Sequence, residues 1–145
     1  MKEDRKMVTE QLRQQLELIL EHNPFSQLIG LEILEIDDGY ARGRVKLEDR
    51  LKNVHGGMHG GCPYAMADTL AGVAASTYGY YTTTIDGSMN YLRPMINTEY
   101  VYCEARVVRQ GGTVGVYQTE LTNDQKEVLA IGTFSYYKTT TPLAE

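Results

Sequence analysis

Apolar residues near the start of the chain recur at helical spacing, separated by Glu, Gln and Arg. The members of this stripe are Val8, Leu12, Leu16, Ile19 and Leu20. The pattern predicts an amphipathic helix over 8–21 that packs one face on the rest of the protein. Pro24 disfavours helical backbone at Asn23, so we expect the helix to end there and a short connector to follow.

The next segment alternates between apolar and acidic positions. Leu31 and Ile33 alternate with Glu, and after a slip of one residue Leu34 and Ile36 continue the alternation. An Asp-Asp-Gly turn sequence then precedes a second, less regular alternation. We therefore predict a β-hairpin over 31–47.

A polar, glycine-rich loop over 48–61 is predicted to lead into a helix. From Cys62 to Thr77 the sequence is apolar nearly all round. Pro63 suits the first turn of a helix, because a missing N–H costs nothing there. A helix without a polar face is buried on most sides.

The rest of the chain is rich in β-forming residues. Four such segments are joined by short turn sequences typical of antiparallel neighbours: 78–94, 98–110, 113–123 and 127–140. The tail, 139–145, is expected to fray.

These elements predict an α+β fold in which an antiparallel sheet wraps around the one buried helix. We divide the chain into an N-terminal amphipathic helix, 1–24, and a single domain, 25–145. A sheet of this length cannot cover both of its faces from one chain, so we expect a homodimer.

Composition narrows the classes of function. The chain has 145 residues, 42% of them hydrophobic and 23% charged, as in an ordinary soluble domain. A net charge of -5 and scattered basic residues argue against a nucleic-acid partner. We find no signal-peptide character and no apolar run long enough for a membrane span. Cys62 and Cys103 have neither the spacing of a metal motif nor the number of a disulfide framework, which predicts a reduced, cytoplasmic protein.

Asp68 is the first candidate for chemistry. Its helical neighbours at three and four residues are Tyr64, Ala65, Ala71 and Gly72, none of them basic. A buried Asp without a local partner costs roughly 1–3 kcal/mol. Either a distant Arg or backbone N–H satisfies it, or the small residues beside it admit a ligand or a second chain.

Gly60 and Gly61 stand where the buried helix begins. Free N–H groups at a helix N-terminus, with glycine allowing close approach, form the geometry of an oxyanion hole. A simple tight turn before the helix is the alternative interpretation.

Two other readings of this loop are weaker. His55 and His59 are four residues apart, but the glycines between them argue against a helix and no third ligand stands at a familiar spacing, so we expect no metal. A Cys62 nucleophile is conceivable beside His59, but the start of a buried helix favours a packed cysteine.

The full loop motif resembles that of a known family. Asn53, Gly56, His59, Gly60 and Gly61 give N-x-x-G-x-x-H-G-G, and Asp68 follows seven residues on. This pattern resembles the PaaI-like branch of the hotdog-fold acyl-CoA thioesterases. The resemblance extends over roughly 30–138, including Tyr-Leu-Arg-Pro at 91–94.

The resemblance implies hydrolysis of an acyl-CoA, without a cofactor, at a site made between two subunits. Asp68 matches the carboxylate that activates water or attacks the carbonyl. Gly60 matches the backbone N–H that polarises the thioester, and Asn53 the loop amide that helps to hold it. His59 matches a residue that positions the loop, and Thr84 one that orients the water across the interface.

Further positions match substrate contacts in similar proteins. We expect these residues to meet the thioester or the CoA moiety: Gly61, Thr83, Arg93, Arg109 and Gly111. The chain departs from the family in a second His-Gly-Gly at 55–57, in Pro63, and in lacking Lys or Arg at the 111–112 turn.

The same fold also serves acyl-CoA dehydratases and non-catalytic acyl-binding proteins, which remain the alternatives. A dehydratase needs an acid/base pair, and a mere binder gains nothing from a buried, unpaired acid. The 11 tyrosines, among them Tyr78, Tyr80 and Tyr81, suit an aromatic acyl pocket, although strands favour tyrosine anyway. An aromatic or medium-chain acyl group and a dimer of dimers are the corresponding expectations.

Overall fold

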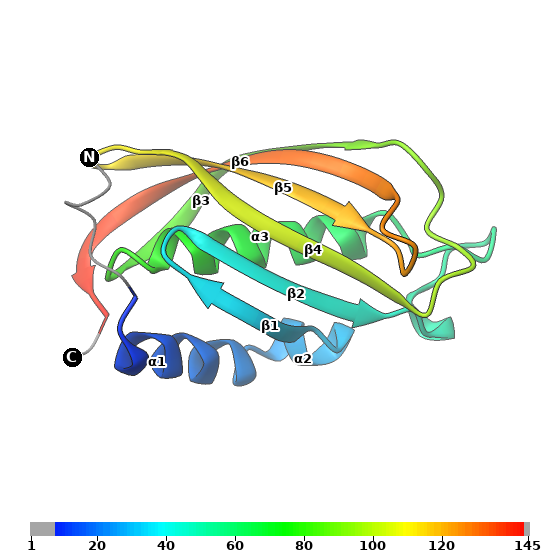
Figure 1. The fold of residues 1–145 in the computed structure, drawn as a ribbon, viewed down its shortest axis with the longest axis horizontal. Coiled ribbons are helices and arrows are strands. Elements are labelled where there is room, and N and C mark those ends of the chain that lie inside the picture. Colours follow the sequence, from blue (N-terminus) through cyan, green and yellow to red (C-terminus); the bar gives the residue numbers. More distant parts are fainter. Residues whose placement is uncertain (1–7, 144–145) are drawn as a thin grey trace.

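Six strands form one antiparallel sheet in the computed structural model, which describes residues 8–143 (Figure 1). The strands are β1 (Glu32–Asp37), β2 (Tyr40–Lys46), β3 (Tyr80–Tyr91), β4 (Tyr100–Gln110), β5 (Val114–Thr122) and β6 (Val128–Pro142). Their order across the sheet is β1-β2-β4-β5-β6-β3. The helices are α1 (Glu10–Glu21), α2 (Pro24–Ile29) and α3 (Gly61–Ser76), with a 3₁₀ turn, η2 (Asp49–Leu51).

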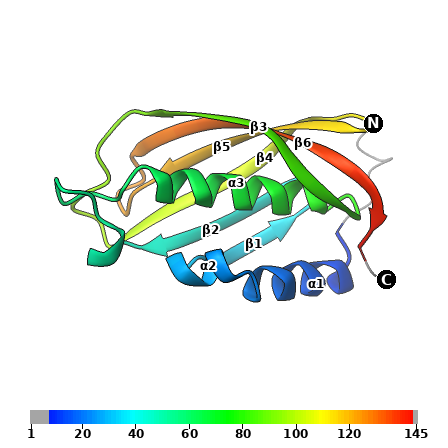
Figure 2. The same cartoon turned by 180° about the vertical axis from the view of Figure 1, so that it is seen from behind.

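The sheet curves around α3, as Figure 2 shows from the helix side. Met66 and Leu70 of α3 are fully buried in the same core as Tyr117 and Phe134 of the sheet. The helix packs on several strands at once because it has no polar face to leave in water. The predicted α+β architecture, an antiparallel sheet wrapped around one central helix, is confirmed.

The β1–β2 hairpin contains the slip that the apolar pattern indicated. The register shifts between Ile33 and Glu35, which makes Leu34 the extra residue of a β-bulge. Leu34 is exposed, whereas Ile36 returns to the core. The bulge therefore explains how two adjacent apolar residues, Ile33 and Leu34, fit into a strand of a sheet that has only one buried face.

The connector expected after α1 is wrong, because residues 24–29 form the short helix α2. The Asn23 side-chain oxygen accepts hydrogen bonds from the N–H groups of Phe25 and Ser26, and Pro24 occupies the first helical position. Gly30, at a φ of 75°, ends the helix in the left-handed conformation. Six residues are too few to show helical periodicity, so only the caps signal this helix.

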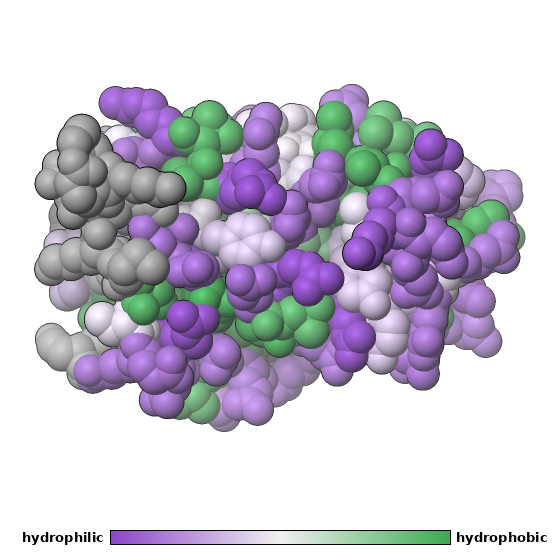
Figure 3. Space-filling model, viewed as in Figure 1, coloured by the Kyte–Doolittle hydropathy of each residue, from purple (hydrophilic) through white to green (hydrophobic). Residues whose placement is uncertain are grey.

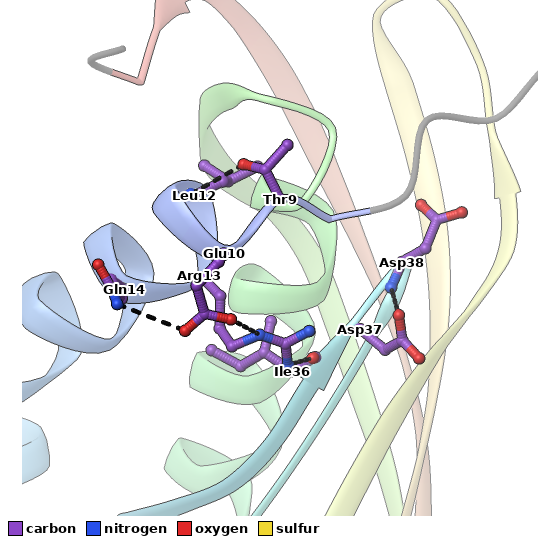
Figure 4. Close-up of polar contacts among 8 residues, drawn as sticks. All are labelled: Thr9, Glu10, Leu12, Arg13, Gln14, Ile36, Asp37 and Asp38. Atoms are coloured by element: carbon purple, nitrogen blue, oxygen red, sulfur yellow. Dashed lines mark hydrogen bonds and ion pairs between the residues drawn. The ribbon is translucent and has the colours of Figure 1, made fainter.

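Helix α1 is fixed to the hairpin beside it. Thr9 caps its N-terminus by accepting the Leu12 N–H at 3.0 Å, and the Arg13 guanidinium donates to the backbone carbonyl of Ile36 (Figure 4). Leu16 and Leu20 of α1 belong to the same buried core as α3. The division at residue 24 stays a prediction, and residues 1–7 lie outside the described part of the chain.

The tail does not fray where expected. Strand β6 runs to Pro142, which lies opposite Tyr80 of β3, and Leu143 is buried; residues 144–145 lie outside the described part. Ladder pairing along the whole of β3 holds this segment in place.

The outer sheet face is mainly hydrophilic, with scattered apolar side chains (Figure 3). Arg44 stacks on the Tyr100 ring at 3.9 Å, and Arg106 lies over Tyr40 at 5.6 Å. Such pairs use several tyrosines of the sheet for surface packing. Among residues 8–143, no helix is both long and apolar enough to cross a membrane.

Candidate functional site

The Asp68 carboxylate lies on α3, half-buried, and is held by two hydroxyl groups. Its Oδ1 accepts hydrogen bonds from Thr84 Oγ1 and from Tyr136 OH, each at 2.8 Å. The Tyr136 hydroxyl also contacts the backbone carbonyl of Asp68. The expectation of an unpaired acid is therefore wrong, and among residues 8–143 the partners of this carboxylate are hydroxyls and not an arginine or a backbone N–H.

Tyr136 is the residue that sequence reasoning missed. It is buried on β6, and burial, reinforced by the nearby Asp68 charge, raises the pKa of its hydroxyl far above the ordinary value. The hydroxyl therefore stays protonated as a donor. Phe134 and Tyr136 alternate as inward-facing residues, and a tyrosine in such a register needs a partner for its hydroxyl, which is the signal that was available.

Thr84 reaches Asp68 from the edge strand β3. Thr84 lies directly opposite Tyr136 in the ladder, and the register shifts between Thr84 and Asp86. Bulges of this kind often lie beside active sites, where they re-aim a side chain. Thr83 is the preceding residue of the strand, so its side chain points to the opposite face of the sheet from that of Thr84. It is exposed and does not line the cavity at Asp68.

A cavity of about 290 Å³ opens beside Asp68. It lies between α1, α3, the start of β3 and the end of β6. Its lining includes Leu16, Ile19, Tyr81, Thr84 and Tyr136. Tyr81 lines this cavity, whereas Tyr80 lies under Lys138. An aromatic acyl pocket stays a prediction.

The loop before α3 is organised around Asn53. The Asn53 side-chain oxygen accepts from the N–H groups of His55 and Gly57, at 2.8 and 3.2 Å. A Cβ on Gly57 would stand only 2.8 Å from Ile96 Cγ2, so the second His-Gly-Gly sequence serves a close approach to the segment after β3. No hydrogen bond of the described residues uses the Asn53 amide nitrogen, which leaves it as a donor.

Of the two glycine N–H groups at the N-terminus of α3, one is available as a hydrogen-bond donor to a ligand. His59 Nδ1 accepts the Gly61 N–H at 3.0 Å, which agrees with a positioning role for His59. Within residues 8–143, the Gly60 N–H has no such acceptor. Tyr91 OH donates to the Gly60 carbonyl at 2.6 Å and fixes the orientation of that residue. Gly60, rather than Gly61, therefore presents the available donor.

Gly60 and Asp68 belong to different cavities in one chain. A second cavity, of about 630 Å³, is lined by Asn53, Gly60, Tyr91 and Arg93 but not by Asp68. The rise of a helix places Gly60 and Asp68 roughly 12 Å apart along its axis. One thioester carbonyl cannot contact both residues of the same chain.

Arg109 and Gly111 lie at the other end of the molecule. Gly111 closes the β4–β5 turn by donating its N–H to the Val114 carbonyl at 2.8 Å. This turn and the loop before α3 occupy opposite ends of the molecule (Figure 1). A single chain therefore does not bring these two residues together with Gly60 and Arg93.

The cysteines are packed side chains. Cys62 is buried, and burial raises the pKa of its thiol to about 11. A thiol with such a pKa is a poor nucleophile at neutral pH. No group of three or more His, Cys, Asp or Glu side chains among residues 8–143 is arranged to hold a metal ion.

The chain is similar to known proteins both in sequence and in structure. A family model described as the thioesterase superfamily matches residues 55–130. The chain is 27% identical over 111 residues to the acyl-coenzyme A thioesterase PaaI of Escherichia coli, a match that covers 77% of this chain and 79% of that protein.

Two solved structures share the architecture. The PaaI protein from the phenylacetic acid degradation operon of E. coli superposes with a TM-score of 0.88 at 23% identity, covering 94% of this chain and 99% of that one. A hypothetical thioesterase with coenzyme A from Streptococcus pneumoniae gives a TM-score of 0.74 at 25% identity, covering 78% and 88%. The sheet and its central helix form the expected hotdog fold.

Proposed function

The chain belongs to the thioesterase superfamily, and since it is a thioester hydrolase of the PaaI-like, hotdog-fold kind, we propose that its substrates are acyl-CoA thioesters. The observation that carries this proposal is the Asp68 carboxylate. Its Oδ1 is fixed by two hydroxyls, while no hydrogen bond of the described residues uses its Oδ2. An oriented carboxylate with one free oxygen suits a general base or nucleophile.

The reaction breaks the acyl carbon–sulfur bond and forms an acyl carbon–oxygen bond. In one course, Asp68 takes a proton from water as the water oxygen attacks the carbonyl carbon, and the proton passes on to the departing CoA thiolate. In the other, Asp68 Oδ2 attacks the carbonyl carbon and expels the CoA thiolate. Water then hydrolyses the acyl-aspartyl anhydride, which restores the carboxylate, and the acid formed gives its proton to the thiolate. The Gly60 N–H and the Asn53 amide stabilise the oxyanion in both courses.

The site combines Asp68 of one copy with Asn53 and Gly60 of a second copy. The separation of these residues within one chain supports this arrangement, because antiparallel packing of two α3 helices about a two-fold axis brings Gly60 near the partner helix's carboxylate. The half-buried positions of α3 around Asp68 include three small residues, Ala65, Thr69 and Gly72, which permit close packing.

The edge of the sheet supports the same dimer. Strand β3 is an unpaired edge of 12 residues with Ile85 and Tyr91 half exposed. A long edge strand presents a row of unpaired backbone groups and so favours pairing with another chain. Pairing β3 with its own copy would join the two sheets.

The remaining predicted residues take supporting roles in this proposal. Thr84 orients the carboxylate or its water, and His59 with Gly61 holds the helix N-terminus in position. Arg93 meets the CoA arm at the cavity that Gly60 lines. Thr83, Arg109 and Gly111 contact the CoA from the partner subunit. In the proposed dimer these residues and the Gly60 of the other copy are placed differently from the same residues within one chain.

The test is release of free thiol from a panel of acyl-CoAs by the wild type and by Asp68→Asn. We expect turnover by the wild type and a loss of at least about 1,000-fold in Asp68→Asn, with the dimer and the melting temperature retained. Equal rates would exclude the role given to Asp68. No turnover by the wild type with any acyl-CoA would exclude the substrate class.

A further inference from the structure

We propose that the cavity between α1 and α3 binds the acyl group of the substrate and limits it to short and medium-sized apolar groups, with α1 as the wall that sets the length. The proposal rests on the proposed function and deepens it. It assigns a substrate-selecting role to a helix outside the part of the chain that the family model matches.

The cavity has apolar walls on several sides, with uncharged polar groups such as Asn23, Ser76 and Thr82 between them. Leu16, Ile19 and Leu20 of α1 form one side, and Val73 of α3 and Leu143 after β6 form others. Asp68 is the one charged residue among those that line it in the described part of the chain. A cavity of this character binds hydrocarbon and offers no cation to a phosphate.

The position of Asp68 determines which part of a thioester enters. The carbonyl carbon must lie against the Asp68 carboxylate, so the acyl group and the CoA arm leave that point in different directions. The cavity lined by Gly60 is larger, about 630 Å³, and sets Arg93 beside apolar residues such as Leu92 and Met95. It has the length for the CoA arm, and Arg93 is a cation for the CoA phosphates. The acyl group is therefore the part left for the α1 cavity.

The size of the cavity restricts its occupant. A volume of about 290 Å³ is at the small end of the roughly 300–1,000 Å³ range for small-molecule pockets. The wall is not free to withdraw, because Arg13 ties α1 to Ile36 of β1 and Leu16 and Leu20 are buried. Hexanoyl and phenylacetyl groups fit this description better than palmitoyl.

Ile19 is the residue with which to test this wall. It lines the cavity yet is 41% exposed, so its replacement leaves the core intact. Leu18 is the matched control: it is the preceding residue of α1, is 54% exposed and does not line the cavity. The variants are Ile19→Trp, which fills the cavity, and Leu18→Trp.

Two readouts are measured for acetyl-, hexanoyl-, phenylacetyl- and palmitoyl-CoA: kcat/KM, and the affinity of ketone analogues in which a methylene separates sulfur from the carbonyl. We expect the wild type to prefer hexanoyl or phenylacetyl over palmitoyl. Ile19→Trp should lower kcat/KM and analogue affinity for these two groups by at least about tenfold while sparing acetyl, and Leu18→Trp should change neither.

Three outcomes would overturn the proposal: a uniform effect of Ile19→Trp on all acyl groups, no effect, or an equal effect of Leu18→Trp. The ketone analogues separate this result from the proposed function. Analogue affinity that depends on acyl length and on Ile19, without hydrolysis of any acyl-CoA, would support the acyl pocket and exclude the hydrolytic function.

Discussion

Two hydroxyl groups fix one oxygen of the Asp68 carboxylate, and they differ in how firmly they are held. Thr84 is exposed on an edge strand, whereas Tyr136 is buried inside the sheet. The Tyr136 hydroxyl also contacts the Asp68 backbone carbonyl and so has two acceptors on one residue. At the residue scale, Tyr136 is therefore the group that positions the carboxylate, while Oδ2 remains for chemistry.

Tyr136→Phe removes only that hydroxyl. We expect kcat to fall about 10- to 100-fold with KM little changed, because the substituted protein still binds substrate but orients the carboxylate less well. Steady-state kinetics on the preferred acyl-CoA measures this split.

Tyr117→Phe serves as the control for that change. Tyr117 is equally buried on the neighbouring strand β5 and donates to Gln110 Oε1 at 2.6 Å, away from Asp68. Its loss should lower stability and leave kcat near wild type. A similar kcat in the two variants would argue that Tyr136 has a structural role only.

The Cys62 thiol yields a pH prediction. Burial raises its pKa from 9 to about 11, so alkylation by iodoacetamide at pH 8 should be about 100-fold slower in the native protein than in the unfolded chain. As pH rises, the thiol ionises first in the unfolded chain. The stability that the buried Cys62 contributes to the folded protein is therefore fully present below pH 9 and is lost as pH rises through 11. Mass spectrometry of labelled protein measures the rate; rapid native labelling with loss of activity would instead indicate a reactive cysteine.

At the scale of elements, the loop before α3 and the N-terminus of α3 form one structural unit. Asn53 uses its side-chain oxygen to hold the loop, and His59 uses Nδ1 to occupy the Gly61 N–H. These bonds leave the Asn53 amide and the Gly60 N–H as donors on one cavity. The glycines and histidines of the loop thus set the conformation from which the donors act.

Gly57→Ala tests the packing of this loop. The added methyl group would meet Ile96 Cγ2 at 2.8 Å and the Met95 carbonyl oxygen at 3.3 Å, so we expect a destabilisation of about 1–3 kcal/mol. Chemical denaturation measures the change.

Gly112→Ala is the comparison for this substitution, because a Cβ there meets nothing within 4 Å. The free energy of unfolding should stay within about 0.5 kcal/mol of wild type. If Gly57→Ala were equally mild, the loop would not depend on its close approach to 95–96.

At the scale of the whole molecule, the two halves of the proposed site lie in separate cavities of one chain. In the proposed dimer, a second copy brings its Asn53 and Gly60 to the Asp68 carboxylate. The exposed edge of β3 and the small residues on α3 offer the surfaces for that copy. Assembly into a dimer of dimers stays a prediction.

Complementation between two inactive variants tests the shared site. Asn53→Asp keeps an acceptor for the loop N–H groups but removes the amide donor, and Asp68→Asn removes the base. A heterodimer of the two contains one site with both native residues, so random mixing should restore about a quarter of wild-type activity.

Co-expression with two affinity tags isolates this heterodimer, and thiol release measures its activity. Each homodimer should be inactive alone. Absence of any restored activity in a verified heterodimer would mean that the site lies within one chain.

The sequence by itself determined the order and type of most elements and showed the motif to which we assign the chemistry. Periodicity and turn residues are local, so the helix over 62–77, the hairpin with its slip and the four later strands were readable. Asp68 and Gly60 were identifiable because a carboxylate and a glycine pair at those places cost stability. Helix α2 was missed because six residues show no period.

Only the tertiary structure decided what meets Asp68. Tyr136 is 68 residues away along the chain, and its hydroxyl reaches the carboxylate because β6 lies beside β3 and beneath α3. The same packing places α1 on the cavity at Asp68 and leaves Gly60 on a different cavity. Such relations depend on how strands are ordered in the sheet and how the helix lies across them, and no local pattern encodes either.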